Sequence, residues 1–340
     1  TDANNHATKR TTDAYGRLVK VEELSAEGGS ASGGNAAATY TTTYAYDALG
    51  NLTQVTDHAG NITTISYDSL GRKLSMNDPD MGVWSYAYDA VDNLTAQTDA
   101  RGVVISFSYD ALNRLTQKSY ADTPLTSHLS PVTYSYDNPA KPFSKGKLTG
   151  IADGSGSSSF EYDKLGRLTK ESKTVDGTTY TIQRAYDLLG RLTSLTYPDT
   201  EVAEYTYNLQ GGIETVGLRP PASGLQPLVS DITYNAAGQV TRIAYGNGVV
   251  SDYTYNPQTL RLSQLSTHNS QLTTLQDFSY TFDAVGNVTQ IQDAVHTGSQ
   301  SFAYDPLHRL TSASGAYGTL TYAYDPLGNL MNKEGVGMTY

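Results

Sequence analysis

The sequence predicts an all-β fold made of tandem antiparallel β-hairpins, and three observations lead to this prediction. The 340 residues include 27 Tyr and 31 Gly, which strands and tight turns favour. A Tyr-Asp pair recurs at nearly regular intervals, and a glycine follows most of these pairs at a fixed distance. Such recurrence indicates one repeat array, although the chain length alone would suggest two or three domains.

The repeating unit is about 21 residues long, and successive units begin 20 to 27 residues apart. A degenerate copy of the repeat precedes them at residues 12–18. Thirteen repeats are recognised by an aromatic residue followed by Asp or Asn, and their aromatic residues are Tyr46, Tyr67, Tyr88, Tyr109, Tyr136, Tyr162, Tyr186, Tyr207, Tyr234, Tyr255, Phe282, Tyr304 and Tyr324.

The first expected element of each repeat is a strand whose aromatic residues lie on one face. Trp84, Tyr86 and Tyr88 alternate with small residues, and Phe107 and Tyr109 repeat the pattern. We expect this aromatic stripe to form the core of the strip rather than a track that stacks on sugars. The stripe consists of Tyr46, Tyr67, Trp84, Tyr86, Tyr88, Phe107, Tyr109, Tyr136, Tyr162, Tyr186, Tyr207, Tyr234, Tyr255, Phe282, Tyr304 and Tyr324.

The second expected element is a turn that starts at the Asp or Asn. Asp at its first position and Gly at its fourth fit a type I turn followed by a residue in the left-handed region. Where the glycine is missing, Asp92, Asn113 or His308 replaces it, and these residue types tolerate positive φ. The expected structural turn residues are Asp47, Gly50, Asp68, Gly71, Asp163, Gly166, Asp187, Gly190, Asp283, Gly286, Asp325 and Gly328.

The remaining elements are a second strand and a second turn. The strand opens with an aliphatic residue, often followed by threonine, as in Leu52-Thr53 and Leu168-Thr169. We expect this aliphatic side chain to pack on the aromatic stripe, since a lone hairpin is marginally stable in water. The second turn lies midway through the regular repeats, as at residues 57–61.

Residues 1–340 are therefore expected to form a single array in which each repeat contacts its sequence neighbours. Loop insertions are expected near residues 28–35, 138–146 and 218–226, because these stretches are rich in Gly, Ser or Pro. Neither end carries the cap that a finished array needs, so we expect an internal segment of a longer chain.

Several function classes are disfavoured by composition and motifs. The formal net charge of −11 and the scattered basic residues argue against nucleic-acid binding, and no apolar run is long enough to insert in a membrane. Cysteine is absent, which excludes disulfides and thiolate chemistry. Residues 77–82 only faintly resemble a calcium loop, and no hydrolase, zinc-protease or phosphate-binding motif occurs. We therefore expect no catalytic residue, cofactor or metal site.

The repeats that begin at Tyr46, Tyr162 and Tyr186 read Tyr-Asp-x-Leu-Gly-Asn/Arg-Leu-Thr. They resemble the YD repeats of the Rhs family, which includes bacterial polymorphic toxins, the C component of insecticidal toxin complexes and the related teneurins. The resemblance covers nearly the whole chain. It implies a spiralling β-strip that forms part of a hollow shell, often around a C-terminal toxin domain of a secreted bacterial protein. The Rhs-associated core that should follow the repeats has no match after Gly328.

The expected function is a non-enzymatic scaffold: a shell segment that encloses or displays a toxin or other cargo in a secreted or cell-surface bacterial protein. Its expected partners are neighbouring repeats or domains of the parent chain and an enclosed toxin domain. Two alternatives stay open, namely an extracellular adhesive or carbohydrate-binding repeat protein that contacts glycans, and a filament-forming surface protein that self-associates end to end.

Overall fold

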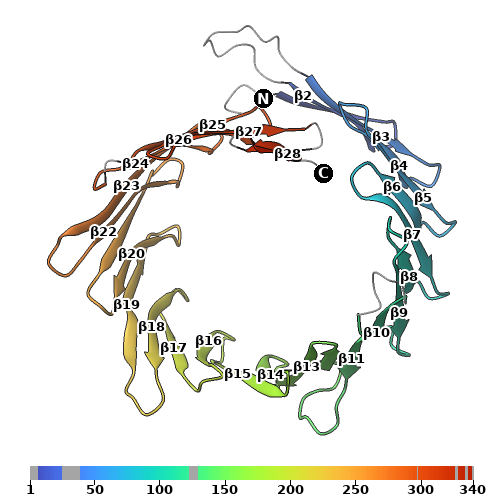
Figure 1. The fold of residues 1–340 in the computed structure, drawn as a ribbon. Helices are drawn as coiled ribbons and strands as arrows, with labels where there is room; N and C mark the ends of the chain where they lie inside the picture. The colour runs from blue at the N-terminus through green and yellow to red at the C-terminus, as the bar shows by residue number, and fades with distance from the viewer. Residues whose placement is uncertain are drawn as a thin grey trace. The chain divides into compact units, whose positions relative to one another are not determined.

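The computed structural model describes residues 7–24, 39–121, 129–296, 298–325, 328–333 and 336–338. These residues form strands and turns and contain no helix, so the all-β prediction is confirmed (Figure 1). It follows that none of them belongs to a helix that could cross a membrane.

The described residues contain twenty-nine strands, which pair in an antiparallel manner. The first fifteen are β1 (Ala7–Thr12), β2 (Leu18–Leu24), β3 (Thr39–Tyr46), β4 (Leu52–Thr56), β5 (Ile62–Tyr67), β6 (Lys73–Asp78), β7 (Gly82–Tyr88), β8 (Leu94–Thr98), β9 (Val104–Tyr109), β10 (Leu115–Tyr120), β11 (Val132–Tyr136), β12 (Leu148–Asp153), β13 (Gly156–Tyr162), β14 (Leu168–Val175) and β15 (Thr178–Tyr186). The others are β16 (Leu192–Thr196), β17 (Val202–Tyr207), β18 (Ile213–Arg219), β19 (Gln226–Tyr234), β20 (Val240–Tyr245), β21 (Val250–Tyr255), β22 (Leu262–His268), β23 (Thr274–Phe282), β24 (Val288–Asp293), β25 (Gln300–Tyr304), β26 (Leu310–Gly315), β27 (Gly318–Tyr324), β28 (Leu330–Lys333) and β29 (Val336–Gly337).

Contacts divide the chain into two units. Residues 1–85, 254–266 and 274–340 form the first unit, and residues 86–253 and 267–273 form the second. In the first unit, β1 to β6 pair in sequence order, as do β23 to β29. In the second unit, β8 to β21 do the same.

A bulge follows the first turn of most repeats, and it gives the recurrent threonine a role. Tyr46 pairs with Leu52 while Ala45 pairs with Gln54, so Thr53 is the extra residue. The Thr53 hydroxyl donates a hydrogen bond to the Ala45 carbonyl across the hairpin at 3.2 Å. Thr169 makes the same bond to the Glu161 carbonyl, and Thr116 to the Ser108 carbonyl. The threonine hydroxyl thus makes a hydrogen bond across the hairpin at the bulge, where the regular strand pairing is interrupted.

The strip has little fully buried interior among the described residues. Val103, Ala203 and Ala313 are the buried hydrophobic residues, and all sixteen residues of the aromatic stripe are half-buried. Along β7 the aromatic residues are half-buried while Val83, Ser85 and Ala87 between them are exposed. A single sheet layer buries its side chains against the next repeat rather than against a second layer.

Two of the expected loop insertions lie within the described residues. Residues 137–147 connect β11 to β12, and the other loop occupies residues 220–225 because Leu218 and Gln226 still pair across β18 and β19. The stretch near residues 28–35 lies outside the described residues.

Candidate functional site

Each first turn is organised around the carboxylate of its leading aspartate. In the repeat at Asp187, one carboxylate oxygen accepts hydrogen bonds from the backbone N–H groups of Leu189 and Arg191, both at 2.9 Å. The other oxygen accepts a bond from the Nε of Arg191 at 2.7 Å. The Gly190 N–H donates to the Asp187 carbonyl at 3.1 Å, which closes the turn. One side chain therefore satisfies three donors that the turn would otherwise leave unpaired.

The other predicted turn residues occupy equivalent positions. Asp47, Asp68, Asp163, Asp283 and Asp325 each accept a backbone N–H from the residue four positions later. The glycines lie in the left-handed region, with φ of 91° at Gly50, 78° at Gly71, 78° at Gly166, 83° at Gly190, 114° at Gly286 and 97° at Gly328. Asp92, Asn113 and His308 adopt φ values of 70°, 60° and 63° at the same position.

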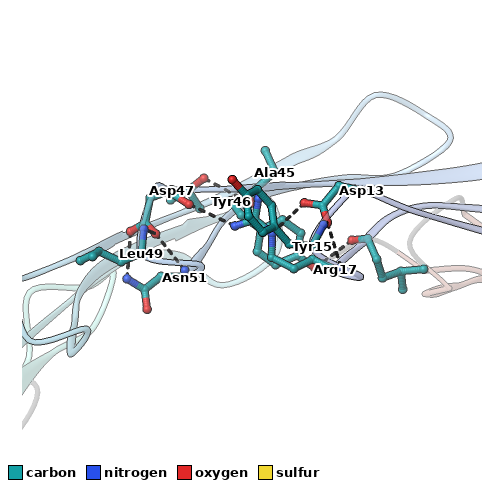
Figure 2. Close-up of polar contacts among 10 residues, drawn as sticks. Asp13, Tyr15, Arg17, Ala45, Tyr46, Asp47, Leu49 and Asn51 are labelled. Carbon is teal, nitrogen blue, oxygen red and sulfur yellow. Dashed lines mark hydrogen bonds and ion pairs between the residues drawn. The ribbon is translucent and has the colours of Figure 1, made fainter.

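The residue after the glycine links one repeat to the next. Figure 2 shows this for the turns at Asp13 and Asp47, where Arg17 lies between them. The Arg17 guanidinium carbon is 4.8 Å from the centre of the Tyr46 ring, and its Nη1 donates to the Asp47 carbonyl at 3.2 Å. We call this arrangement the clasp. In it, the arginine of one turn contacts the tyrosine ring of the next repeat and donates to the backbone carbonyl of the residue after that tyrosine. Cation–π attraction and a hydrogen bond to a charged donor together hold the two turns.

The contact between the arginine and the tyrosine ring recurs along both units, and Arg167 and Arg309 also donate to the following carbonyl. Arg–Tyr distances are 4.8 Å for Arg167 and Tyr186, 4.4 Å for Arg191 and Tyr207, and 4.8 Å for Arg309 and Tyr324. Arg114 lies 4.4 Å from the Tyr136 ring and also forms an ion pair with Asp137 at 2.7 Å. Where asparagine replaces arginine, its amide contacts the next turn directly, as between Asn93 and Asn113 at 3.0 Å.

The tyrosine hydroxyl adds a second link between repeats. The Tyr186 hydroxyl donates to the backbone carbonyl of Leu168, the first residue of the preceding repeat's second strand, at 2.9 Å. Phenylalanine cannot form this bond, so the bond favours tyrosine at this position of the repeat. Equivalent bonds of 2.7 to 2.9 Å come from the hydroxyls of Tyr46, Tyr109, Tyr136, Tyr162, Tyr207, Tyr234, Tyr304 and Tyr324.

The remaining residues of the predicted stripe lie on β5, β7, β9, β21 and β23. Tyr67 ends β5, Trp84, Tyr86 and Tyr88 lie on β7, Phe107 lies on β9, and Tyr255 ends β21. The Trp84 indole N–H donates to the Met81 carbonyl at 3.0 Å. Phe282 ends β23, and its ring centre is 5.8 Å from the Arg261 guanidinium carbon. The stripe is thus a row of half-buried rings, most of which lie at the end of a strand.

Sequence reasoning did not identify the clasp, although the signal was present. Arg or Asn follows the fourth turn position in most repeats, and Gly-Arg and Gly-Asn occur in the quoted motifs. The spacing of residues within one repeat does not identify what these side chains contact, because the contacted residue belongs to the next repeat. The bond to the preceding Leu carbonyl was missed for the same reason.

The carboxylates of the first turns accept hydrogen bonds within those turns. A hydrogen bond from the Asn51 amide holds the pKa of Asp47 below its usual value, and the Arg72 backbone N–H does the same for the pKa of Asp68. Within the described ranges, no three His, Asp or Glu side chains form a group that could hold a metal ion. The arrangement can join repeats, and each aspartate is already used in a turn.

Acid is expected to destabilise the array through these aspartates. Their folded-state pKa values are lowered, so their stabilisation is present above the unfolded value of about 3.9 and is lost as the pH falls through the folded values. The thermal midpoint should therefore be lower at pH 3 than at pH 6, because the carboxylates are partly protonated at the lower pH. Asp187→Asn should be less stable at pH 6 but show a shallower pH dependence. A midpoint that stays constant down to pH 3 would contradict this account of the turn.

Comparison with known proteins identifies the repeat. The RHS Repeat family matches residues 35–61, 46–80, 88–124, 144–179 and 282–320. These matched residues contain RHS repeats. Toxin subunit YenC1 of Yersinia entomophaga is 32% identical over 129 residues, which is 34% of this chain and 13% of YenC1. Toxin subunit YenC2 of the same organism is 30% identical over 124 residues, or 32% of this chain and 13% of YenC2.

Solved structures contain the same fold. A crystal structure of TcdB2-TccC3 matches with a TM-score of 0.85 and 22% identity, over 97% of this chain and 19% of that chain. A Tc holotoxin pore from Photorhabdus luminescens matches with a TM-score of 0.84 and 23% identity, over 96% and 18%. The chain therefore spans about a fifth of the length of these larger chains and 13% of the length of YenC1 and YenC2.

Proposed function

We propose that this chain is a non-enzymatic scaffold, a segment of an RHS-repeat shell that encloses or displays a toxin or other cargo in a secreted or cell-surface bacterial protein. The observation that carries the proposal is the clasp, which joins repeat to repeat through side chains and so makes a continuous wall. Toxin subunits among the relatives support a cargo of the toxin class. The hydroxyls of the stripe are bound to backbone carbonyls, so they favour a structural role over sugar recognition.

The wall also has an edge suited to contacts with the rest of a longer protein. The third position of the first turn carries a strongly exposed aliphatic side chain in several repeats, with exposed fractions of 70% at Leu112, 63% at Leu165 and 79% at Leu189. We call these side chains the tip row. Where one repeat of two strands follows another directly, as at Leu165 and Leu189, neighbouring tips lie about 10 Å apart. A surface whose features repeat at the same spacing could contact each of these side chains. We therefore infer that the tip row contacts another stretch of the repeat strip in the parent chain.

Protease protection of the cargo tests this function in the full-length polypeptide that carries the chain. Replacing Leu112→Ser and Leu165→Ser together should leave the thermal midpoint of the 340-residue chain unchanged within about 2 °C, because these side chains are exposed in it. The rate at which protease cleaves the cargo should rise about tenfold, since weakened contacts between strips open the wall.

The matched control replaces their exposed neighbours, Ala111→Ser and Lys164→Ser, and should leave both quantities unchanged. Cargo that is cleaved as fast in the unaltered polypeptide as when it is produced alone would overturn the proposed function. Specific binding on a glycan array by the unaltered chain would favour the adhesive alternative instead.

A further inference from the structure

A cleft of about 750 Å³ opens in the second unit between the first turns that begin at Asn208 and Asn235. Its walls come from these two turns and from the adjoining strands β18 and β19. The side chains that matter below are those of Asn208, Glu214, Asp231, Tyr234 and Asn235. Lys, Arg and His are absent from its lining, which leaves two carboxylates, amide groups and one aromatic ring.

The cleft lies where other repeats place an arginine of the clasp. In the two preceding intervals, Arg167 and Arg191 extend from one turn over the tyrosine of the next, Tyr186 and Tyr207. The corresponding residue here is Gly212, which has no side chain to extend. The carboxylate that pairs with the arginine elsewhere is also replaced, because Asn208 stands in place of the turn aspartate. Both members of the ion pair are therefore missing together.

The groups that receive the guanidinium in other repeats are nevertheless present. The Tyr234 hydroxyl donates to the Ile213 carbonyl at 2.8 Å, and the ring lies so close to Gly212 that a Cβ there would be 3.0 Å from it. The hydroxyl of this ring therefore makes the same bond as in the repeats that carry the clasp. The Asn235 carbonyl accepts the Gly238 N–H at 3.0 Å, as the Asp187 carbonyl accepts the Gly190 N–H at 3.1 Å while also accepting Arg167 at 2.8 Å. A carbonyl oxygen has two lone pairs, so the turn at Asn235 can accept a second donor in the same way.

We propose that this cleft binds a guanidinium group supplied from outside the repeat, namely the side chain of an arginine in another polypeptide segment. The ring of Tyr234 and the carbonyl of Asn235 offer the contacts that the clasp arginines use elsewhere. Glu214 and Asp231 supply the negative charge that the turn aspartate supplies in other repeats. An arginine side chain fits better than a lysine, because a planar guanidinium can lie over the ring and donate to the carbonyl at once.

Nuclear magnetic resonance titration of the 340-residue chain with Nα-acetylarginine amide tests the proposal. Saturable shifts are expected at the amides of Gly211, Gly212 and Gly238, and binding of the isosteric neutral citrulline derivative should be at least about tenfold weaker. A short peptide that contains one arginine should bind more tightly than the amide if the ligand is a polypeptide segment. The double substitution Asn208→Asp with Gly212→Arg, which restores the clasp, should abolish the shifts.

A second pair of variants tests the proposal without relying on how the arginine introduced at position 212 packs. Glu214→Gln and Asp231→Asn should each weaken binding several-fold without changing the thermal midpoint, whereas Glu204→Gln, which removes a carboxylate outside the cleft, should leave binding unchanged. Equal binding of the arginine and citrulline derivatives would overturn the proposal. So would unchanged shifts in the variant with the restored clasp, or tighter binding of neutral sugars than of the arginine amide.

Discussion

Replacing Gly156 by alanine is expected to lower the free energy of unfolding by about 3 to 5 kcal/mol. Gly156 begins β13 with a φ of 142°, a conformation that an L side chain rarely adopts. A Cβ at this position would lie 1.9 Å from the backbone carbonyl oxygen of Thr174 on β14. The backbone of one of the two strands must then move, and the pairing between them must weaken.

Gly177→Ala is the matched control for this substitution. Gly177 also lies in a short hairpin turn, between β14 and β15, with a φ of 77°, but a Cβ there would meet no atom within 4 Å. It should cost only the strain of a left-handed residue, about 1 kcal/mol. Denaturant unfolding measures both costs, and hydrogen exchange should show the loss centred on β13 and β14 for Gly156→Ala. Equal costs for the two variants would mean that the close contact with Thr174 does not exist in solution.

Removing the ring of Tyr186 is expected to have the second-largest effect. Tyr186→Ala deletes a half-buried ring, its cation–π contact with Arg167 and its hydrogen bond to the Leu168 carbonyl, and should cost about 3 kcal/mol. Tyr186→Phe deletes the hydrogen bond alone and should cost about 1 kcal/mol. Phe282 occupies the equivalent position in its own repeat, so the phenylalanine variant should fold. The difference between the two variants measures how much of the clasp depends on the ring.

Tyr180, on the same strand, provides the comparison for this pair. Its side chain is 50% exposed, so Tyr180→Phe should change the free energy of unfolding by less than about 0.5 kcal/mol. Denaturant unfolding of the three variants decides the matter. If Tyr186→Phe is as neutral as Tyr180→Phe, the hydroxyl bond between repeats contributes nothing and the abundance of tyrosine needs another explanation.

The local elements could be predicted because their causes are local. The Asp at the start of a turn such as 187–190 bonds to backbone groups two and four residues later, and the left-handed glycine lies within the same turn. Alternating aromatic residues, as on β7, report which face of a strand is covered. Both patterns are complete within about ten residues, so they can be read without knowing how the repeats assemble.

The clasp could not be predicted in this way because its atoms come from different repeats. Arg167 and Tyr186 are 19 positions apart, and only the pairing of the strands between them brings the guanidinium onto the ring. The sequence also did not show how the aromatic rings are packed. The structure shows that they are half-buried and that a hydroxyl such as that of Tyr186 bonds to a backbone carbonyl. The cleft beside Gly212 is recognised only by comparison with repeats whose arginine is seen in place.

The sequence by itself determined the all-β class, the repeat and its turns, because hydrogen bonding and backbone strain within a few residues leave little choice there. The tertiary structure alone decided how the repeats are joined, which aromatic rings contact an arginine side chain, and at which repeat this arginine is replaced. These features depend on distances across paired strands, which follow from register and bulges rather than from the order of residues in any one repeat.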